Sequence, residues 1–219
     1  MVQLYNIKTT GSLTERAYET LKTSILDLDL KPGELIDVED ISAQLEISRT
    51  PIRTALNKLM EEELVEMIPG KGTFVTRLTE KQVIDLFNVR ELLECYSVRL
   101  ATELRSEVDL ENLQYILNKQ ELTFNIRNGH KEFLMYDAEF HSLISKISNN
   151  TYLEKQLSLM HVNCMRYLNA SSQDKVHKAA LEEHKELFEQ IRNKNVDKAI
   201  LSMRKHIDKM KLRINDYIL

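Results

Sequence analysis

Apolar residues recur every three or four positions along most of this 219-residue chain, a spacing that predicts amphipathic helices. Ala17, Leu21, Ile25 and Leu28 follow this spacing near the N-terminus, and Lys31-Pro32-Gly33 ends the helix that they predict. The chain therefore begins with a helix of about four turns that has one buried side.

Two more helices and a hairpin are predicted before residue 80. Residues 38–45 and 48–62 have helical spacing and are separated by a tight turn. Residues 64–68 and 73–75 predict two short strands, joined by the turn Pro69-Gly70-Lys71-Gly72. Three helices followed by a two-stranded ribbon form a winged helix-turn-helix.

One face of the helix at 48–62 is polar and suits contacts to double-stranded DNA. The second helix of a helix-turn-helix enters the major groove, where arginine donates two hydrogen bonds to guanine O6 and N7, and the wing meets phosphate or the minor groove. The residues predicted to contact DNA are Arg49, Thr50, Arg53, Asn57, Lys71 and Gly72. From this pattern alone, a solvated face or a plain interaction module is an equally good interpretation.

Proline and glycine divide the chain. All three prolines and four of the five glycines precede residue 80. Because both residues interrupt helices, the remainder can be helical almost throughout. We therefore predict a mainly α protein with a DNA-binding domain at 1–78 and an antiparallel all-helical bundle at 79–219. Its six predicted helices are 79–105, 108–128, 131–148, 151–169, 174–193 and 196–217.

Polar side chains interrupt the apolar faces of three of these helices. Asp137 and His141 share the apolar side of one helix, and His184 and His206 occupy the apolar sides of two others. A single histidine in such a place usually packs in the core, but three with a carboxylate suit a divalent metal ion. Zn²⁺ is favoured, with Ni²⁺ and Mn²⁺ as the other candidates.

Arg90 lies within an apolar stripe, one turn before Glu94. A charge in this place needs a partner, which is either Glu94 itself or the carboxylate of a ligand. Asn163, Arg166 and Tyr167 are further candidates for setting the specificity for such an acid. We list Arg90, Arg166 and Asn163 as the predicted effector-binding residues.

Composition excludes several classes of protein. With 42% apolar and 29% charged residues, the chain is too hydrophobic to be disordered. No stretch approaches the ~18 apolar residues of a membrane span, and residues 1–10 lack the apolar core of a signal peptide, so we expect a cytoplasmic protein. Cys95 and Cys164 are too few for a disulfide framework and are expected to be buried thiols.

The sequence of residues 12–76 resembles the N-terminal domain of the GntR family of bacterial transcription regulators. The resemblance rests on Ile47-Ser48-Arg49-Thr50-Pro51-Ile52-Arg53-Thr54-Ala55-Leu56 and on Pro69-Gly70-Lys71-Gly72-Thr73-Phe74-Val75. Two positions depart from the family. Glu39 stands where some members have a DNA-contacting arginine, and Thr54 replaces a common glutamate, so a relative's operator sequence cannot be transferred.

Residues 79–215 resemble the helical FCD effector domain of the FadR-type subfamily. The matching sequences are Arg90-Glu91-Leu92-Leu93-Glu94, Asp137-Ala138-Glu139-Phe140-His141, Glu183-His184 and Arg204-Lys205-His206-Ile207. The resemblance implies metal ligation by Asp137, His141, His184 and His206. It also implies an organic-acid effector on the metal, which Arg90 reaches, and a helical dimer interface.

These observations predict a homodimeric, ligand-responsive transcription regulator, such as a repressor, that binds palindromic operator DNA and is not an enzyme. Two alternatives stay open: a dimerisation domain with a purely structural metal, and a metal-dependent hydrolase. The hydrolase is disfavoured because no general base is evident beside the ligands and a winged helix is attached.

Overall fold

The computed structural model describes residues 11–77, 79–127, 129–170 and 174–218. The chain divides into two compact units. The first comprises Met1–Leu78 with Val162–Asn169, and the second comprises Thr79–His161 with Ala170–Leu219. Leu78, the last residue of the predicted first domain, lies outside the described residues.

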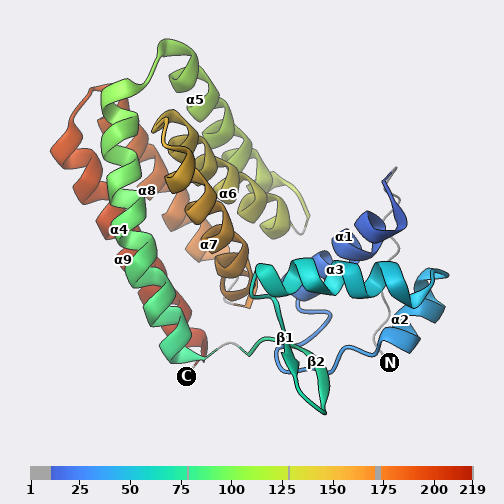
Figure 1. Cartoon of the computed structure of the whole chain (residues 1–219). Coiled ribbons are helices and arrows are strands. Elements are labelled where there is room, and N and C mark those ends of the chain that lie inside the picture. Colours follow the sequence, from blue (N-terminus) through green and yellow to red (C-terminus); the bar gives the residue numbers. More distant parts are fainter. Residues whose placement is uncertain (1–10, 78, 128, 171–173, 219) are drawn as a thin grey trace. The chain divides into compact units, whose positions relative to one another are not determined.

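The first unit has the predicted winged helix-turn-helix elements, labelled in Figure 1. Its helices and strands are α1 Leu13–Leu26, α2 Val38–Leu45, α3 Arg49–Glu61, β1 Val65–Ile68 and β2 Gly72–Val75. Side chains cap the first two helices: Ser12 accepts a hydrogen bond from the Glu15 amide, and Asp37 accepts from the amides of Glu39 and Asp40. The helices enclose an apolar core that includes Leu21, Ile52 and Leu59.

The hairpin pairs Val65 with Val75 and Ile68 with Gly72 in an antiparallel register. Its turn depends on glycine because Gly70 and Gly72 have φ angles of +74° and +121°, where a side chain would strain the backbone. The turn of the wing therefore lies directly beyond the last paired residues, Ile68 and Gly72.

The second unit is an all-helical bundle in which α4 packs along α9, α8 packs against α9, and α5 packs against α6 (Figure 1). The helices are α4 Glu80–Leu104, α5 Glu107–Leu122, α6 His130–Ile147, α8 Asp174–Arg192, α9 Val196–Ile218 and the part of α7 Thr151–Ala170 that precedes Val162. A reciprocal pair of hydrogen bonds between Thr79 and Gln82 caps the start of α4. Five of the six bundle helices lie within one residue of their predicted bounds.

The prediction of a helix over residues 108–128 was wrong at its end. The α-helix stops at Leu122, and a single 3₁₀ turn, η1 Thr123–Asn125, follows it. The buried Thr123 hydroxyl donates to the Gln120 carbonyl at 2.6 Å, which satisfies a carbonyl that an α-helix would have used further along. The chain then turns into α6.

Gly129 precedes α6 where the chain approaches its own backbone closely. A Cβ atom there would lie 2.2 Å from the Thr123 carbonyl oxygen and 3.2 Å from the Ile126 carbonyl oxygen. Its φ angle of −69° is available to any residue, so the need for glycine is steric.

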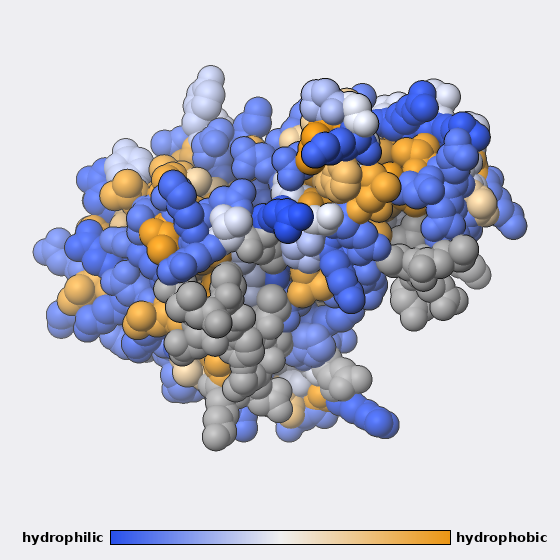
Figure 2. All heavy atoms as spheres, turned by 90° about the horizontal axis from the view of Figure 1, so that it is seen from below, coloured by the Kyte–Doolittle hydropathy of each residue, from blue (hydrophilic) through white to orange (hydrophobic). Residues whose placement is uncertain are grey.

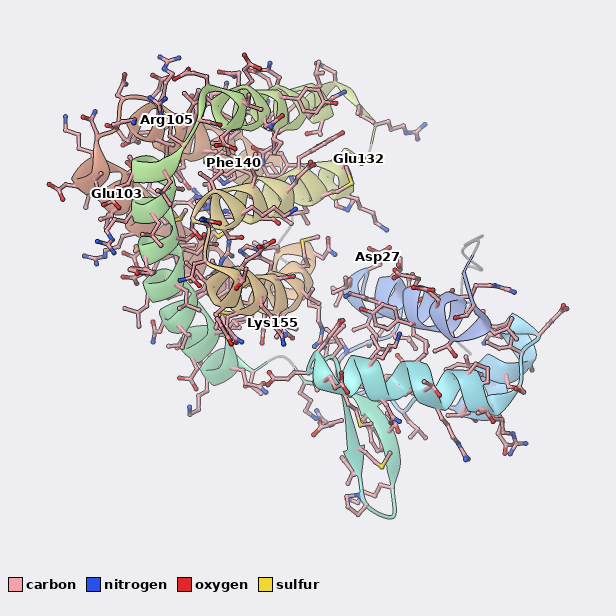
Figure 3. The ribbon with its side chains drawn as sticks, turned by 45° about the horizontal axis from the view of Figure 1, so that its top comes forward. Asp27, Glu103, Arg105, Glu132, Phe140 and Lys155 are labelled. Atoms are coloured by element: carbon pink, nitrogen blue, oxygen red, sulfur yellow. The ribbon has the colours of Figure 1, made fainter. Side chains whose placement is uncertain are left out.

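Polar side chains cover most of the exposed surface. Figure 2 shows one face, on which hydrophobic residues form small groups between hydrophilic ones. Figure 3 shows Phe140 directed into the bundle, where it is fully buried, whereas Glu103, Glu132 and Lys155 are exposed. No helix among the described residues is long and apolar enough to cross a membrane. Cys95 and Cys164 are buried free thiols, as predicted.

We predict that Gly129→Ala destabilises the second unit because the added methyl group meets backbone atoms that cannot rotate away. The expected loss is about 1–3 kcal/mol in the free energy of unfolding, measured by urea denaturation. Met135→Ala, at a half-exposed position of the same helix, serves as the control and should change stability by less. Equal effects of the two substitutions would contradict the steric role of Gly129.

Candidate metal centre and candidate DNA interface

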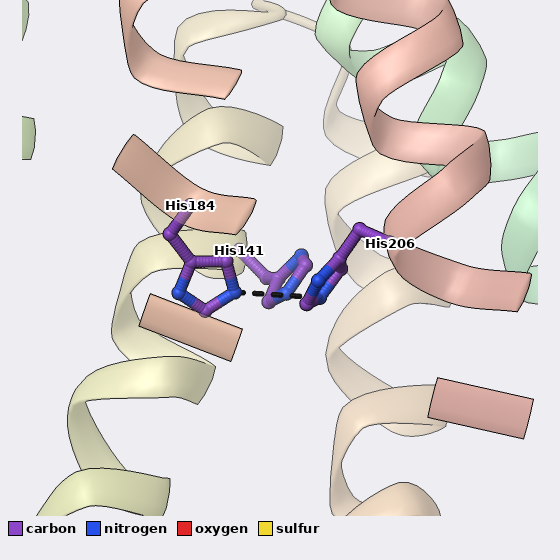
Figure 4. A group of neighbouring side chains, drawn as sticks. All are labelled: His141, His184 and His206. Carbon is purple, nitrogen blue, oxygen red and sulfur yellow. Dashed lines mark hydrogen bonds between the residues drawn. The ribbon is translucent and has the colours of Figure 1, made fainter. Parts of the chain in front are cut away.

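Three histidines from three helices meet in the core of the bundle (Figure 4). His141 on α6, His184 on α8 and His206 on α9 are each fully buried. One ligand nitrogen of each lies within 4.8 Å of the others. Phe140 stacks on the His184 ring at 4.6 Å between centroids, which fixes the plane of that ring.

Asp137 joins this group from the turn of α6 that precedes His141. Its side chain is almost fully buried, and Oδ1 lies 3.5 Å from His184 Nε2. The i, i+4 spacing on one helix places Asp137 and His141 on the same side. The structure thus brings together Asp137, His141, His184 and His206, the four residues predicted as ligands.

An oxygen atom lies beside the Nδ1 atom of each histidine. His184 Nδ1 lies 3.0 Å from Gln120 Oε1, and His206 Nδ1 lies 2.8 Å from Glu183 Oε2. His141 Nδ1 lies 3.0 Å from Glu94 Oε1. Carboxylate and amide oxygens accept hydrogen bonds, so the contacts of His184 and His206 favour the proton on Nδ1 and leave the lone pair on Nε2. The contact of His141 with Glu94 is close but lacks the geometry of a hydrogen bond.

The Nε2 atoms of His184 and His206 face each other at 3.3 Å (Figure 4). Burial lowers the pKa of His141 and of His184, so both are neutral near pH 7. Two lone pairs that face each other repel unless a cation lies between them. Two nitrogens on one tetrahedral ion, with bonds of 2.0–2.1 Å, are separated by about 3.3 Å. This donor set therefore fits a divalent metal ion.

Glu183 connects His206 to cationic side chains. Arg213 donates to Glu183, and Lys209 Nζ lies 3.2 Å from its Oε1. Burial raises the pKa of Glu183, but the hydrogen bonds from His206 and Arg213 and their charges outweigh it and lower the pKa to about 2. The carboxylate is ionised at neutral pH and holds the His206 ring in place through its contact with Nδ1.

Glu94, His141 and His161 form a second buried group of metal-ligating residue types. Glu94 Oε1 lies 2.8 Å from His161 Nε2 and 3.2 Å from Arg90 Nε. Burial raises the pKa of Glu94, but His141, His161 and Arg90 lower it well below its usual value. Because the Arg90 guanidinium lies beside the same oxygen, its positive charge opposes a second metal ion there.

Glu94 is therefore a partner of Arg90, one of the two alternatives that the sequence left open. The other predicted effector-binding residues belong to the first unit. Asn163 Nδ2 donates to the Glu62 carbonyl at 3.1 Å, and Arg166 donates to Oγ1 and to the carbonyl of Thr76. Asn163 and Arg166 thus have partners within the first unit, whereas Arg90 has a partner within the second.

Sequence reasoning did not identify Gln120 and Glu183 as partners of the candidate ligands. Gln120 is a fully buried polar residue on the apolar side of α5, and this interruption of the stripe was the available signal. Glu183 directly precedes His184, but its contact is with His206 on the next helix. That pairing depends on how α8 and α9 pack, which residue spacing does not reveal.

The candidate DNA interface lies on α3 and the wing of the first unit. The apolar side of α3 is buried, and the predicted DNA-contacting residues Arg49, Thr50, Arg53, Asn57, Lys71 and Gly72 are all exposed. Arg49 Nη1 lies 2.8 Å from Glu39 Oε1 on α2. The side chains that could read bases are thus accessible, and one of them is paired with a carboxylate.

Comparison with known families gives two matches along the chain. Residues 13–75 match the model of bacterial regulatory proteins of the gntR family, and residues 85–209 match the FCD domain. The chain belongs to the GntR family. It is a transcription regulator with a winged helix-turn-helix and a helical FCD effector domain, as the sequence predicted.

Curated relatives match most of the chain. It is 30% identical to the uncharacterized HTH-type transcriptional regulator YdhC of Bacillus subtilis, over 83% of this chain and 82% of that protein. It is also 30% identical to the Nta operon transcriptional regulator of Aminobacter aminovorans, over 82% and 83%. The solved structure of E. coli McbR/YncC has the same fold, with a TM-score of 0.78 and 22% identity over 94% of this chain and 99% of that chain. These families and relatives are regulators, which contradicts the hydrolase alternative.

We predict that Gln120→Leu weakens metal binding because it removes the oxygen that orients His184. Loss of such an outer partner typically lowers metal affinity by about 10- to 100-fold. Chelator competition on the purified full chain measures the change. Gln114→Leu makes the same substitution at an exposed position of α5 and should bind metal as the wild type does. Equal affinities in both variants would show that Gln120 does not orient a ligand.

Proposed function

We propose that this GntR-family regulator binds palindromic operator DNA as a homodimer and responds to a small organic acid at a divalent metal ion. In this proposal residues 1–78 bind DNA, and residues 79–219 hold the metal and the effector and form the dimer interface. We further propose that it acts in the cytoplasm and represses its target genes.

The observation that carries the effector site is the convergence of His141, His184 and His206, with Asp137 beside His184 and the Nε2 atoms of His184 and His206 directed at each other. Three imidazoles and one carboxylate favour Zn²⁺, and Ni²⁺ or Mn²⁺ accept the same donors. Such an ion supplies a Lewis-acidic position for a carboxylate oxygen when it accepts a further ligand. The buried Arg90 adds a second positive charge in the same bundle core.

A purely structural metal is the second candidate, and one contact favours it. Arg90 is already paired with Glu94, so its charge is neutralised within the chain. An effector carboxylate would have to compete with Glu94 for the guanidinium or share it. The response to small acids therefore distinguishes the two candidates.

The DNA-binding part of the proposal rests on the exposed polar side of α3. Arg49, Arg53 and Asn57 are spaced to contact successive base edges, with Thr50 beside Arg49. Lys71 and Gly72 place the wing against the phosphate backbone or the minor groove.

Dimerisation is supported by exposed apolar side chains on α4. Val89, Leu92 and Tyr96 recur at three- and four-residue spacing, with 45%, 69% and 45% of their surface exposed. A second copy of the chain would remove this stripe from water. Two-fold symmetry would then present two α3 helices to the two halves of a palindrome.

We predict that small organic acids raise the melting temperature of the metal-loaded protein and have no such effect after chelation. A ligand that binds only the folded state stabilises it by mass action. A thermal-shift screen of monocarboxylates, dicarboxylates and sugar acids, with and without chelator, measures this response. Absence of any shift on protein shown to hold metal would support the structural metal and contradict the effector site.

We predict that Arg49→Ala weakens specific DNA binding by about 1–3 kcal/mol because a bidentate contact to guanine is lost. The comparison is between the selected operator and random DNA at fixed salt concentration. Arg77→Ala removes the same charge from an exposed position outside α3 and should leave the specificity ratio unchanged. Unchanged specificity in Arg49→Ala would remove Arg49 from the DNA interface.

A further inference from the structure

A carboxylate occupies the candidate DNA interface. Glu39, in the first turn of α2, lies 2.8 Å through Oε1 from Nη1 of Arg49, the first residue of α3. Both side chains are open to solvent, with 70% of Glu39 and 57% of Arg49 exposed. Exposed ion pairs contribute little to folding stability, so stability gives no account of this one.

The position of the pair connects it to base recognition. The N-terminal residues of the second helix of a helix-turn-helix contact base edges, and Arg49 begins that helix. A carboxylate in the same place is repelled by phosphate and has no donor on the DNA backbone to accept from. Its favourable partners on DNA are the amino groups of bases in the major groove.

We infer that Glu39 is a specificity-determining residue: it holds Arg49 on a guanine and itself accepts a hydrogen bond from the N4 amino group of an adjoining cytosine. This inference rests on the DNA interface proposed above and adds a second base to it. The operator half-site would then contain a guanine read by Arg49 and, beside it, a cytosine read by Glu39.

The hydrogen-bonding capacity of the pair allows both contacts. Nη1 of arginine carries two hydrogens, so donating one to Glu39 leaves another that can act with Nη2 on guanine O6 and N7. Glu39 uses Oε1 on Arg49, and Oε2 is a second acceptor on the same carboxylate. Holding the guanidinium in one orientation also reduces the entropy that Arg49 loses on binding.

Cytosine is the base that suits a carboxylate. Guanine presents two acceptors in the major groove, and thymine presents an acceptor and a methyl group. Adenine has an amino group, but its N7 acceptor lies next to it and repels a carboxylate. Cytosine offers the N4 donor without a neighbouring acceptor on its major-groove edge.

The test is selection of binding sites from a pool of random duplexes by the metal-loaded full chain, followed by affinity measurements on the selected duplex and single-base variants. The proteins compared are wild type, Glu39→Gln, Arg49→Ala and the control Glu61→Gln. Glu61 is an exposed residue at the other end of α3, so its substitution removes an equal charge from the same helical unit.

We expect wild type and Glu61→Gln to select the same half-site, with a cytosine beside the guanine. Glu39→Gln should lose roughly tenfold in its preference for that cytosine and should bind random DNA at least as tightly, because one negative charge is gone. Glu39→Gln that selects the wild-type half-site with the same preference would overturn the inference.

The variants separate the two proposals. If Arg49→Ala loses preference at the guanine while Glu39→Gln behaves as wild type, the DNA interface stands and only the role of Glu39 fails. If Arg49→Ala selects as the wild type does, Arg49 is removed from the DNA interface, and the inference about Glu39 fails with it. In the double variant Glu39→Gln/Arg49→Ala, the loss at the guanine should equal that of Arg49→Ala alone, because the two residues act on it together.

Discussion

The helical domain is organised around three buried imidazoles, two of which direct their Nε2 atoms at each other. Buried polar atoms are unfavourable unless they are satisfied, and here the Nδ1 atoms of His184 and His206 are hydrogen-bonded to Gln120 on α5 and Glu183 on α8, while Glu94 on α4 lies beside Nδ1 of His141. The histidines themselves come from α6, α8 and α9. Five helices are therefore positioned by one set of polar contacts, which only their correct packing satisfies. A cation held by these imidazoles would complete the arrangement and would link metal binding to folding.

Periodicity predicted the architecture well because it reports burial directly. A helix with one apolar side packs that side against the core. The bounds of α6 through α9 follow from where the apolar side begins and ends. The end of α5 escaped prediction because apolar spacing does not distinguish the 3₁₀ turn at Thr123–Asn125 from a continuing α-helix. The meeting of the four candidate ligands was predictable because each is a polar residue on an apolar face. Gln120 and Glu183 were not, since their roles exist only through contacts between helices.

Residue spacing also fails to identify the partners of Arg90 and Glu39. Sequence spacing placed Arg90 one turn before Glu94, but it could not decide between an internal partner and a ligand, and the structure shows the internal contact. For Glu39, the sequence indicated only that it stands where some GntR-family members have a DNA-contacting arginine. The contact with Arg49 joins two helices across a turn, and its geometry depends on the packing of α2 against α3. Contacts between long side chains therefore cannot be predicted without coordinates, whereas helices with an apolar stripe can be predicted from the sequence.

Acidity in the DNA-binding part has a consistent physical meaning. Residues 1–77 contain nine Lys and Arg residues and thirteen Asp and Glu residues, so this part is repelled by DNA in general. Such a domain gains little from non-specific attraction to phosphate and must take more of its affinity from base edges. The pairing of Arg49 with Glu39 further reduces the non-specific attraction to phosphate. It leaves hydrogen-bonding groups that only certain bases satisfy. The net charge of −4 is therefore compatible with operator recognition and shifts the balance from affinity toward selectivity.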